Sequence, residues 1–231
     1  MNKSLIFLLD VSSSMLDFGR DAALYSAMGR LTFEVFPNVT PPEDLDLTVR
    51  ILAFGNEKIT WVYGDQDVGV PYRNFDWKAA QGSMPGFAGN TPLGAAIDEV
   101  VNTLYYGESL SDPNQAAPAI ILISDGEPTD DFEDRFRAAL EKKVGAERQG
   151  LFNRSLRTAI GLGLGEDDKG RRGRDMLKSF GRLSKSLRQK GLQTYYDVDD
   201  NNLDQLGTII MSLTQGLSEE VDGDSDWGNP G

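Results

Sequence analysis

Short, fully apolar segments alternate along the chain with stretches whose apolar residues recur at helical spacing. Leu5–Leu9 and Ala119–Ile123 are apolar at every position, which is typical of strands buried on both faces of a sheet. A turn at Gly55-Asn56 joins two further strand-like segments into a hairpin. We expect strands over residues 5–9, 47–54, 58–63, 119–123, 156–164 and 194–198.

The stretches between these strands repeat apolar residues every three or four positions, as one buried helix face requires. We expect helices over residues 21–36, 92–104, 132–144, 176–187 and 203–217. Asp130 and Glu133 resemble a capping box, and Asp199 or Asp200 is placed to cap the last helix. Residues 64–90 are rich in Gly, Pro, Asp and aromatics without a period, which predicts a long loop.

Strands that alternate with helices predict a doubly wound, Rossmann-like α/β fold: a mostly parallel central sheet with one antiparallel edge strand and helices on both faces. We assign residues 1–217 to one domain and residues 218–231 to an acidic, disordered tail. In such sheets, ligands bind beyond the carboxyl ends of the strands.

The composition excludes several classes of catalytic site, metal site and partner. The 231 residues include no Cys and no His, which excludes disulfides, thiolate or imidazole metal sites and a Ser-His-Asp triad. The net charge of −13 argues against the whole chain coating nucleic acid or anionic lipid. The apolar runs are too short for a membrane span or a signal-peptide core, so we expect a cytoplasmic protein without membrane contact.

Carboxylates and hydroxyls gather where predicted strands end and a helix begins. Asp10, Ser12 and Ser14 follow the first strand, Asp125 follows another buried strand, and Thr91 precedes a helix. Each segment alone is compatible with an ordinary turn or cap. Together, at one edge of the sheet, they form a set of hard oxygen ligands that suits Mg²⁺ or Mn²⁺. With only two formal negative charges, the set would leave a bound ion electrophilic enough to take a carboxylate from outside.

The order Asp-x-Ser-x-Ser, then Thr, then Asp-Gly resembles the metal-ion-dependent adhesion site (MIDAS) of von Willebrand factor type A (vWA) domains, over about residues 3–217. The resemblance implies Asp10, Ser12 and Ser14 as ligands, with Thr91 and Asp125 completing the shell directly or through water. Ile123–Asp131 and Asn90–Ala96 look most like the bacterial TerY-type branch, which is linked to tellurite resistance and stress response.

Two features depart from that pattern and give candidate partner surfaces. The 64–90 loop carries Tyr72, Phe75, Trp77 and Phe87, which either pack the loop onto the body or form a rim for a partner. The second departure is the basic segment at residues 165–190, within a stretch, residues 135–190, that holds 16 of the 23 basic residues. They form either solvated helix faces or a docking surface for an acidic partner or nucleic acid, in which Arg171, Arg172 and Arg174 would take part.

Our hypothesis from these features is a non-catalytic, Mg²⁺-dependent protein-interaction module. Its partner would present an acidic residue to the metal. One alternative is a phosphoryl-transfer hydrolase with Asp10 as nucleophile. It lacks the second carboxylate two residues on, where Ser12 stands. The other alternative is a nucleic-acid accessory protein acting through residues 135–190, where aromatics are few.

Overall fold

The central sheet has the strand order β3-β2-β1-β5-β8-β9, with β4 paired to β2. The computed structural model describes residues 2–43, 45–64, 69–110, 116–144 and 148–220. β1 is parallel to β2 and β5, β5 is parallel to β8 and β8 to β9, whereas β3 and β4 run antiparallel to β2. The strands of this sheet are β1 (Asn2–Asp10), β2 (Asp46–Gly55), β3 (Lys58–Tyr63), β4 (Val70–Pro71), β5 (Ala119–Ser124), β8 (Leu156–Leu162) and β9 (Tyr195–Val198).

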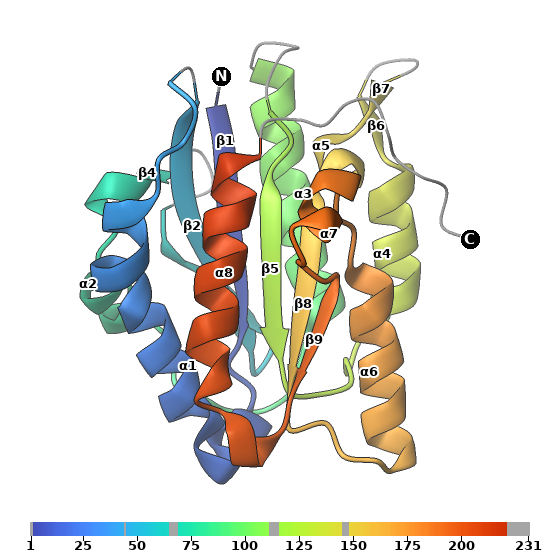
Figure 1. Ribbon diagram of the computed structural model, residues 1–231. Coiled ribbons are helices and arrows are strands. Elements are labelled where there is room, and N and C mark those ends of the chain that lie inside the picture. Colours follow the sequence, from blue (N-terminus) through green and yellow to red (C-terminus); the bar gives the residue numbers. More distant parts are fainter. Residues whose placement is uncertain (1, 44, 65–68, 111–115, 145–147, 221–231) are drawn as a thin grey trace.

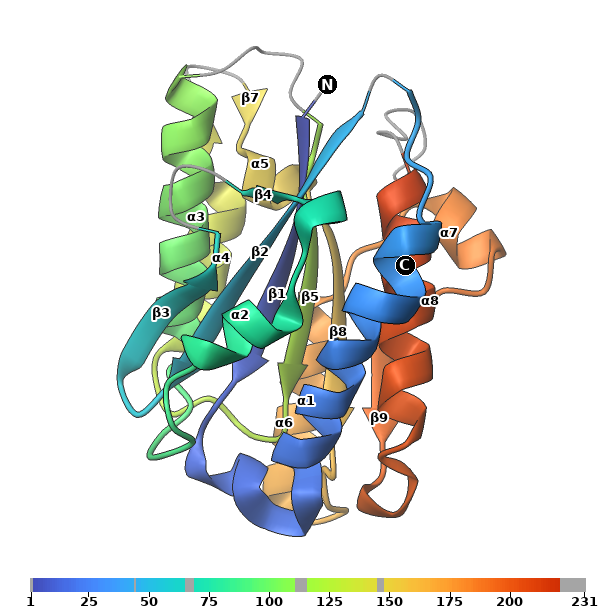
Figure 2. The same ribbon diagram turned by 90° about the vertical axis from the view of Figure 1, so that its left-hand side faces the viewer.

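Helices cover both faces of this sheet (Figures 1 and 2). One face is covered by α1 (Arg20–Arg30), α2 (Trp77–Gly82), α7 (Lys185–Gln189) and α8 (Gln205–Glu219). The other is covered by α3 (Leu93–Leu110), α4 (Phe132–Glu141), α5 (Leu151–Arg154) and α6 (Asp168–Phe180). A separate two-stranded ribbon joins β6 (Lys143–Val144) to β7 (Arg148–Gln149). The doubly wound α/β class predicted from the sequence is confirmed.

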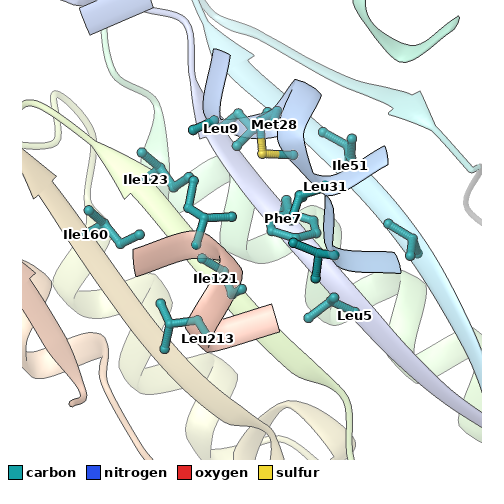
Figure 3. Packing of buried hydrophobic residues seen from close by; sticks show 14 of the residues in the cluster. Leu5, Phe7, Leu9, Met28, Leu31, Ile51, Ile121, Ile123, Ile160 and Leu213 are labelled. Carbon is teal, nitrogen blue, oxygen red and sulfur yellow. The ribbon is translucent and has the colours of Figure 1, made fainter. Parts of the chain in front are cut away.

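The apolar run in β1 feeds both cores because successive side chains point to opposite faces of a strand. Leu5, Phe7 and Leu9 pack under α1 and α8, together with Met28 and Leu213 (Figure 3). Ile6 and Leu8 pack on the α3 side. This two-sided burial explains why β1 shows no polar alternation until Asp10, where the strand ends.

Several element boundaries differ from those expected. Residues 64–90 are not all loop, since the described part contains β4, a 3₁₀ turn at Tyr72–Asn74 and α2. The helix expected over 176–187 is two helices, α6 and α7, separated at residues 181–184. The final helix continues to Glu219, beyond the expected domain end at residue 217, and residues 221–231 of the expected tail lie outside the described residues.

The expected Asp130–Glu133 capping box does not form. Asp131 occupies the N-cap position of α4, without a capping hydrogen bond from its side chain. The Asp130 carboxylate instead accepts hydrogen bonds from the backbone N–H groups of Gly94 and Ala95, at 2.9 and 2.8 Å, in the first turn of α3. At the other helix, Asp199 caps the turn at Asp200–Asn202 that leads into α8. None of the described helices combines the length and apolarity needed to cross a bilayer.

Candidate metal centre

The candidate site lies at the carboxyl ends of β1 and β5, which are neighbours in the sheet. The chain crosses from β1 to β2 on one side, and β5 lies on the other, so the site is at the point where strand order reverses. Such a point leaves a crevice between loops that diverge in opposite directions. Asp10 closes β1, and Asp125 is the first residue after β5.

Asp10 is fully buried, and both oxygens of its carboxylate accept hydrogen bonds. Oδ1 accepts from the backbone N–H of Ser12 at 2.8 Å, and Oδ2 accepts from the Ser124 hydroxyl at 2.6 Å. Burial is the largest influence on this group, and the charge of Asp125 adds to it. Together they raise the pKa of Asp10 from 3.8 to about 6. The carboxylate is therefore ionised at neutral pH in a setting that favours a nearby cation.

The hydroxyls of the Ser12–Ser14 turn lead from Asp10 to Asp125. The Oγ atoms of Ser12 and Ser14 lie 3.1 Å apart, and Ser14 Oγ donates to Asp125 Oδ1 at 2.9 Å. Burial raises the pKa of Asp125, while the hydrogen bonds from Ser14 and Arg20 oppose that rise. Hydrogen bonds thus connect Asp10, Ser12, Ser14 and Asp125 into one group, through the Ser12 backbone N–H and the two serine hydroxyls.

Thr91 lies beside this group, at the start of α3, and is 5% exposed. A Cβ placed on Gly126 would be 3.8 Å from Thr91 Oγ1, and the Thr91 carbonyl accepts a hydrogen bond from the Thr129 N–H at 3.0 Å. The loop that carries Asp125 is therefore packed against Thr91. The five residues expected as ligands come from three segments that are distant in sequence. They meet at the carboxyl ends of β1 and β5.

Close backbone contacts hold the Thr91 segment in place. Ser13 N–H donates to the Gly89 carbonyl at 3.2 Å, and Asn56 N–H donates to the Asn90 carbonyl at 3.1 Å. Gly89 has φ of +63°, and a Cβ there would collide with Asn56. A glycine is required at this position because both the conformation and the space exclude a side chain.

Arg20 is a member of this centre that the sequence analysis missed. Its Nη1 donates to Asp125 Oδ2 at 2.8 Å. Its Nε and Nη2 donate to the two carboxylate oxygens of Asp200 at 2.6 and 2.7 Å. The side chain is 8% exposed. A lone arginine at a helix start carries no signal of this role, since its partners lie 105 and 180 residues away. Ser124 and Asp200 were likewise not assigned to the site.

The donor set fits a hard divalent cation. In the described part of the chain, no three acidic side chains converge as metal ligands, so a cation here would rely on hydroxyl oxygens besides Asp10 and Asp125. Oxygen-only donors suit Mg²⁺ or Mn²⁺ and are poor for softer ions. Because Arg20 already shares the charge of Asp125, the site carries less net negative charge than two free carboxylates would.

The aromatic rim expected from residues 64–90 is wrong for three of its four members. Tyr72, Phe75 and Trp77 are 8, 5 and 5% exposed and belong to the core beside α1. Phe87 is partly buried, with its ring centroid 5.6 Å from that of Tyr25. Their apolar area packs this segment onto the body, which is the alternative that the sequence left open.

The three arginines expected to face a partner all lie on α6 and pair with acidic residues of this chain. Arg171 pairs with Asp168, Arg172 with Glu127 and Arg174 with Asp197. Ion pairs at exposed positions contribute little to stability, and they reduce the positive field available to an outside partner. For these three arginines, the structure favours a helix face that attracts acidic residues of the same chain.

The exposed apolar side chains near the metal centre are Leu16 and Phe18, which are 54 and 76% exposed. Both lie in the 3₁₀ segment Ser13–Gly19 that carries the Ser14 hydroxyl. Phe18 has φ of +56°, a left-handed conformation that is unusual for a bulky residue, and its ring centroid is 5.3 Å from the Arg20 guanidinium carbon. The sequence gives little sign of this exposure, because Leu16 and Phe18 follow the motif like ordinary core residues.

Comparison with known proteins supports the fold through structure alone. No protein-family model matches the sequence, and no curated protein matches it. A von Willebrand factor type A structure from Catenulispora acidiphila aligns with a TM-score of 0.59 and 16% identity, over 94% of this chain and 42% of that chain. This chain has the vWA fold. At 16% identity, the likeness to that structure establishes the architecture of this chain and not its function.

Two other structures with this fold were solved with a metal. Proximal thread matrix protein 1 from the mussel byssus, with a zinc-occupied MIDAS motif, aligns with a TM-score of 0.61 and 15% identity, over 93% of this chain and 48% of that chain. The manganese-loaded TRAP protein of Plasmodium vivax aligns with a TM-score of 0.50 and 15% identity, over 96% of this chain and 75% of that chain. This chain spans less than half the length of the Catenulispora and mussel chains.

Proposed function

We propose that this chain is a non-catalytic protein-interaction module that depends on Mg²⁺ or Mn²⁺. The observation that carries the proposal is the convergence of two carboxylates and three hydroxyls at the switch point of a vWA fold. Asp10, Ser12, Ser14, Thr91 and Asp125 would hold the ion, directly or through water. A bound ion would supply an electrophilic position for an acidic side chain of the partner.

The residues of the site would have different roles in holding that ion. Asp10 is fixed by Ser12 and Ser124, so its carboxylate has little freedom to rotate. Asp125 is shared between Ser14 and Arg20. Because Arg20 also forms an ion pair with Asp200, its guanidinium is held beside Asp125 and limits the negative charge that faces the ion. Limited ligand charge keeps a divalent ion receptive to an outside carboxylate.

The rim of the interface would come from Leu16 and Phe18. Both belong to the segment that carries Ser14, and both are exposed, whereas the aromatics of residues 72–77 are not. A single ionic contact selects partners poorly, and buried apolar area around it adds specificity. We expect the partner's acidic residue to be flanked by an apolar side chain that packs on Phe18.

A hydrolase is the weaker candidate. Aspartyl phosphoryl transfer requires an acid/base group near the nucleophile, and the position two residues after Asp10 is Ser12, whose hydroxyl is committed to Ser14. A nucleic-acid role through residues 135–190 is also weaker, because the arginines of α6 are paired with acidic groups. The TerY-like segments support a cytoplasmic stress-response complex in a bacterium as the setting.

Affinity capture with matched baits tests this function. Wild-type protein and Thr91→Ala would be used as baits with Mn²⁺ and again with chelator. We expect a partner that is retained by wild type with Mn²⁺ and lost at least tenfold both with chelator and with Thr91→Ala, whose melting temperature should stay close to that of wild type. Retention that ignores both changes would contradict a metal-dependent interface.

A further inference from the structure

We propose that the groove between α4 and α6 binds a short basic, amphipathic segment of a partner protein, separately from the metal centre. The groove has a volume of about 800 Å³. Its α4 wall is formed by Phe132, Phe136 and Leu140, which are spaced four residues apart and therefore lie along one face of the helix. Its α6 wall includes Met176 and Ser179. The two helices stand on the same side of the sheet (Figure 1).

Two of the apolar lining residues belong to the core, since Phe132 is 3% and Phe136 is 8% exposed. The rings of Phe132 and Phe136 are stacked, with centroids 5.3 Å apart and planes 12° from parallel, and Phe136 also contacts Phe180 of α6. Leu140 and Met176 are only partly buried, so they leave apolar surface open to a ligand. The apolar surface that a ligand can reach therefore comes mainly from Leu140 on α4 and Met176 on α6.

The rim of the groove is acidic. Six of the lining residues are acidic and two are basic: Glu127, Asp130, Asp131, Glu133, Asp134 and Asp175 against Arg137 and Arg172. Both arginines are already neutralised, Arg172 by Glu127 and Arg137 by Asp134. Among the described residues, Asp131, Glu133 and Asp175 form no ion pair, and all three are exposed.

Those three carboxylates determine the class of ligand. The apolar surface of Leu140 and Met176, set between unpaired acidic side chains, complements a helix with Leu, Ile or Met on one face and Lys or Arg at its margins. An acidic or phosphorylated segment would be repelled here. The net charge of −13 would also draw a basic segment toward the molecule before it docks.

A peptide-binding assay in chelator separates this site from the metal centre. The probe is a fluorescein-labelled 14-residue peptide of Lys and Leu with every Leu on one helical face, followed by anisotropy. The competitors are a scrambled Lys/Leu peptide and a patterned Glu/Leu peptide. The groove variant is Asp131→Asn/Glu133→Gln/Asp175→Asn. The matched control, Asp46→Asn/Glu57→Gln/Asp204→Asn, removes the same charge from exposed positions elsewhere.

We expect saturable binding that weakens at least tenfold in the groove variant and less than twofold in the control. The scrambled and Glu/Leu peptides should compete poorly. Equal losses in the two variants would show only general attraction to an acidic protein and would overturn the proposal. Equal competition by the scrambled peptide, or no binding at all, would overturn it too. Because chelator is present throughout, none of these outcomes depends on the metal-dependent function.

Discussion

At the residue scale, Asp10 shows how the site affects the stability of the fold. Its carboxylate is buried and close to Asp125, and these two influences raise its pKa to about 6. A carboxylate with a native pKa above its unfolded value destabilises the metal-free fold at higher pH, and this penalty disappears as the pH falls from about 6 towards 4. From the shift, the penalty at pH 7.5 is on the order of 3 kcal/mol.

Asp10→Asn should therefore stabilise the metal-free protein. The amide can still accept from Ser12 N–H and can donate to the Ser124 hydroxyl, so only the charge is lost. We expect urea unfolding in chelator to show a gain of about 2–3 kcal/mol at pH 7.5 that shrinks by more than half at pH 4.5. Asp46→Asn, at an exposed position, should change little. A gain that is the same at both pH values would contradict the buried-charge account.

Residue patterns revealed the five candidate ligands but not the contacts that position them. Asp-x-Ser-x-Ser is a local motif, and its place after an apolar strand is legible in sequence. Arg20 and Asp200 became part of the centre through contacts that span most of the chain. Such contacts depend on how the ends of β5 and β9 meet the start of α1, which no local pattern records.

At the element scale, the strands were predicted better than the helices. Apolar runs such as Leu5–Leu9 have a single physical explanation, burial on both faces, and β1 and β5 lie where expected. The first two turns of α6 were not predicted, because they consist of Asp, Lys, Arg and Gly with almost no apolar period. That helix forms through packing instead: Gly170 and Gly173 are buried, and the Asp167 side chain caps its N-terminus by accepting from Gly170 N–H at 2.8 Å.

Arg157 in β8 fastens two of these helices to the sheet. It is 4% exposed and lies within 6 Å of the ring centroids of Phe136, Phe152 and Phe180. Its Nε donates to the Phe180 carbonyl at 3.0 Å, at the end of α6, and its Nη1 donates to the Phe152 carbonyl at 2.6 Å, in α5. Burial, with a smaller contribution from Arg182, lowers the pKa of Arg157 to about 9, so it remains charged at neutral pH.

Arg157→Lys should destabilise the protein although it conserves the charge. An ammonium group cannot reproduce the planar fork that reaches both carbonyls and stacks among three rings. We expect a loss of about 2–3 kcal/mol in urea unfolding, as for a broken buried hydrogen-bond network. Arg137→Lys on exposed α4 is the control, with a change near zero. Equal effects of the two substitutions would show that Arg157 does not link α5 and α6.

At the scale of the whole molecule, charge is arranged by intramolecular pairing. The basic stretch looks like a docking surface in sequence, yet the described arginines of α6 face acidic residues of this chain. The unpaired charge that remains beside an apolar groove is acidic, on α4 and α6. Pairing between distant elements cannot be read from charge runs, because a run shows where charges are and not what they face.

The central claim about the whole molecule is that it binds a divalent cation at the carboxyl ends of β1 and β5. Titration calorimetry of Mn²⁺ into wild type, Asp10→Asn and Asp46→Asn tests this claim without a known partner. We expect one ion per molecule in wild type and in Asp46→Asn, and affinity at least tenfold lower, or lost, in Asp10→Asn. Absence of binding in wild type, or equal affinity in wild type and Asp10→Asn, would contradict the metal centre and the function built on it.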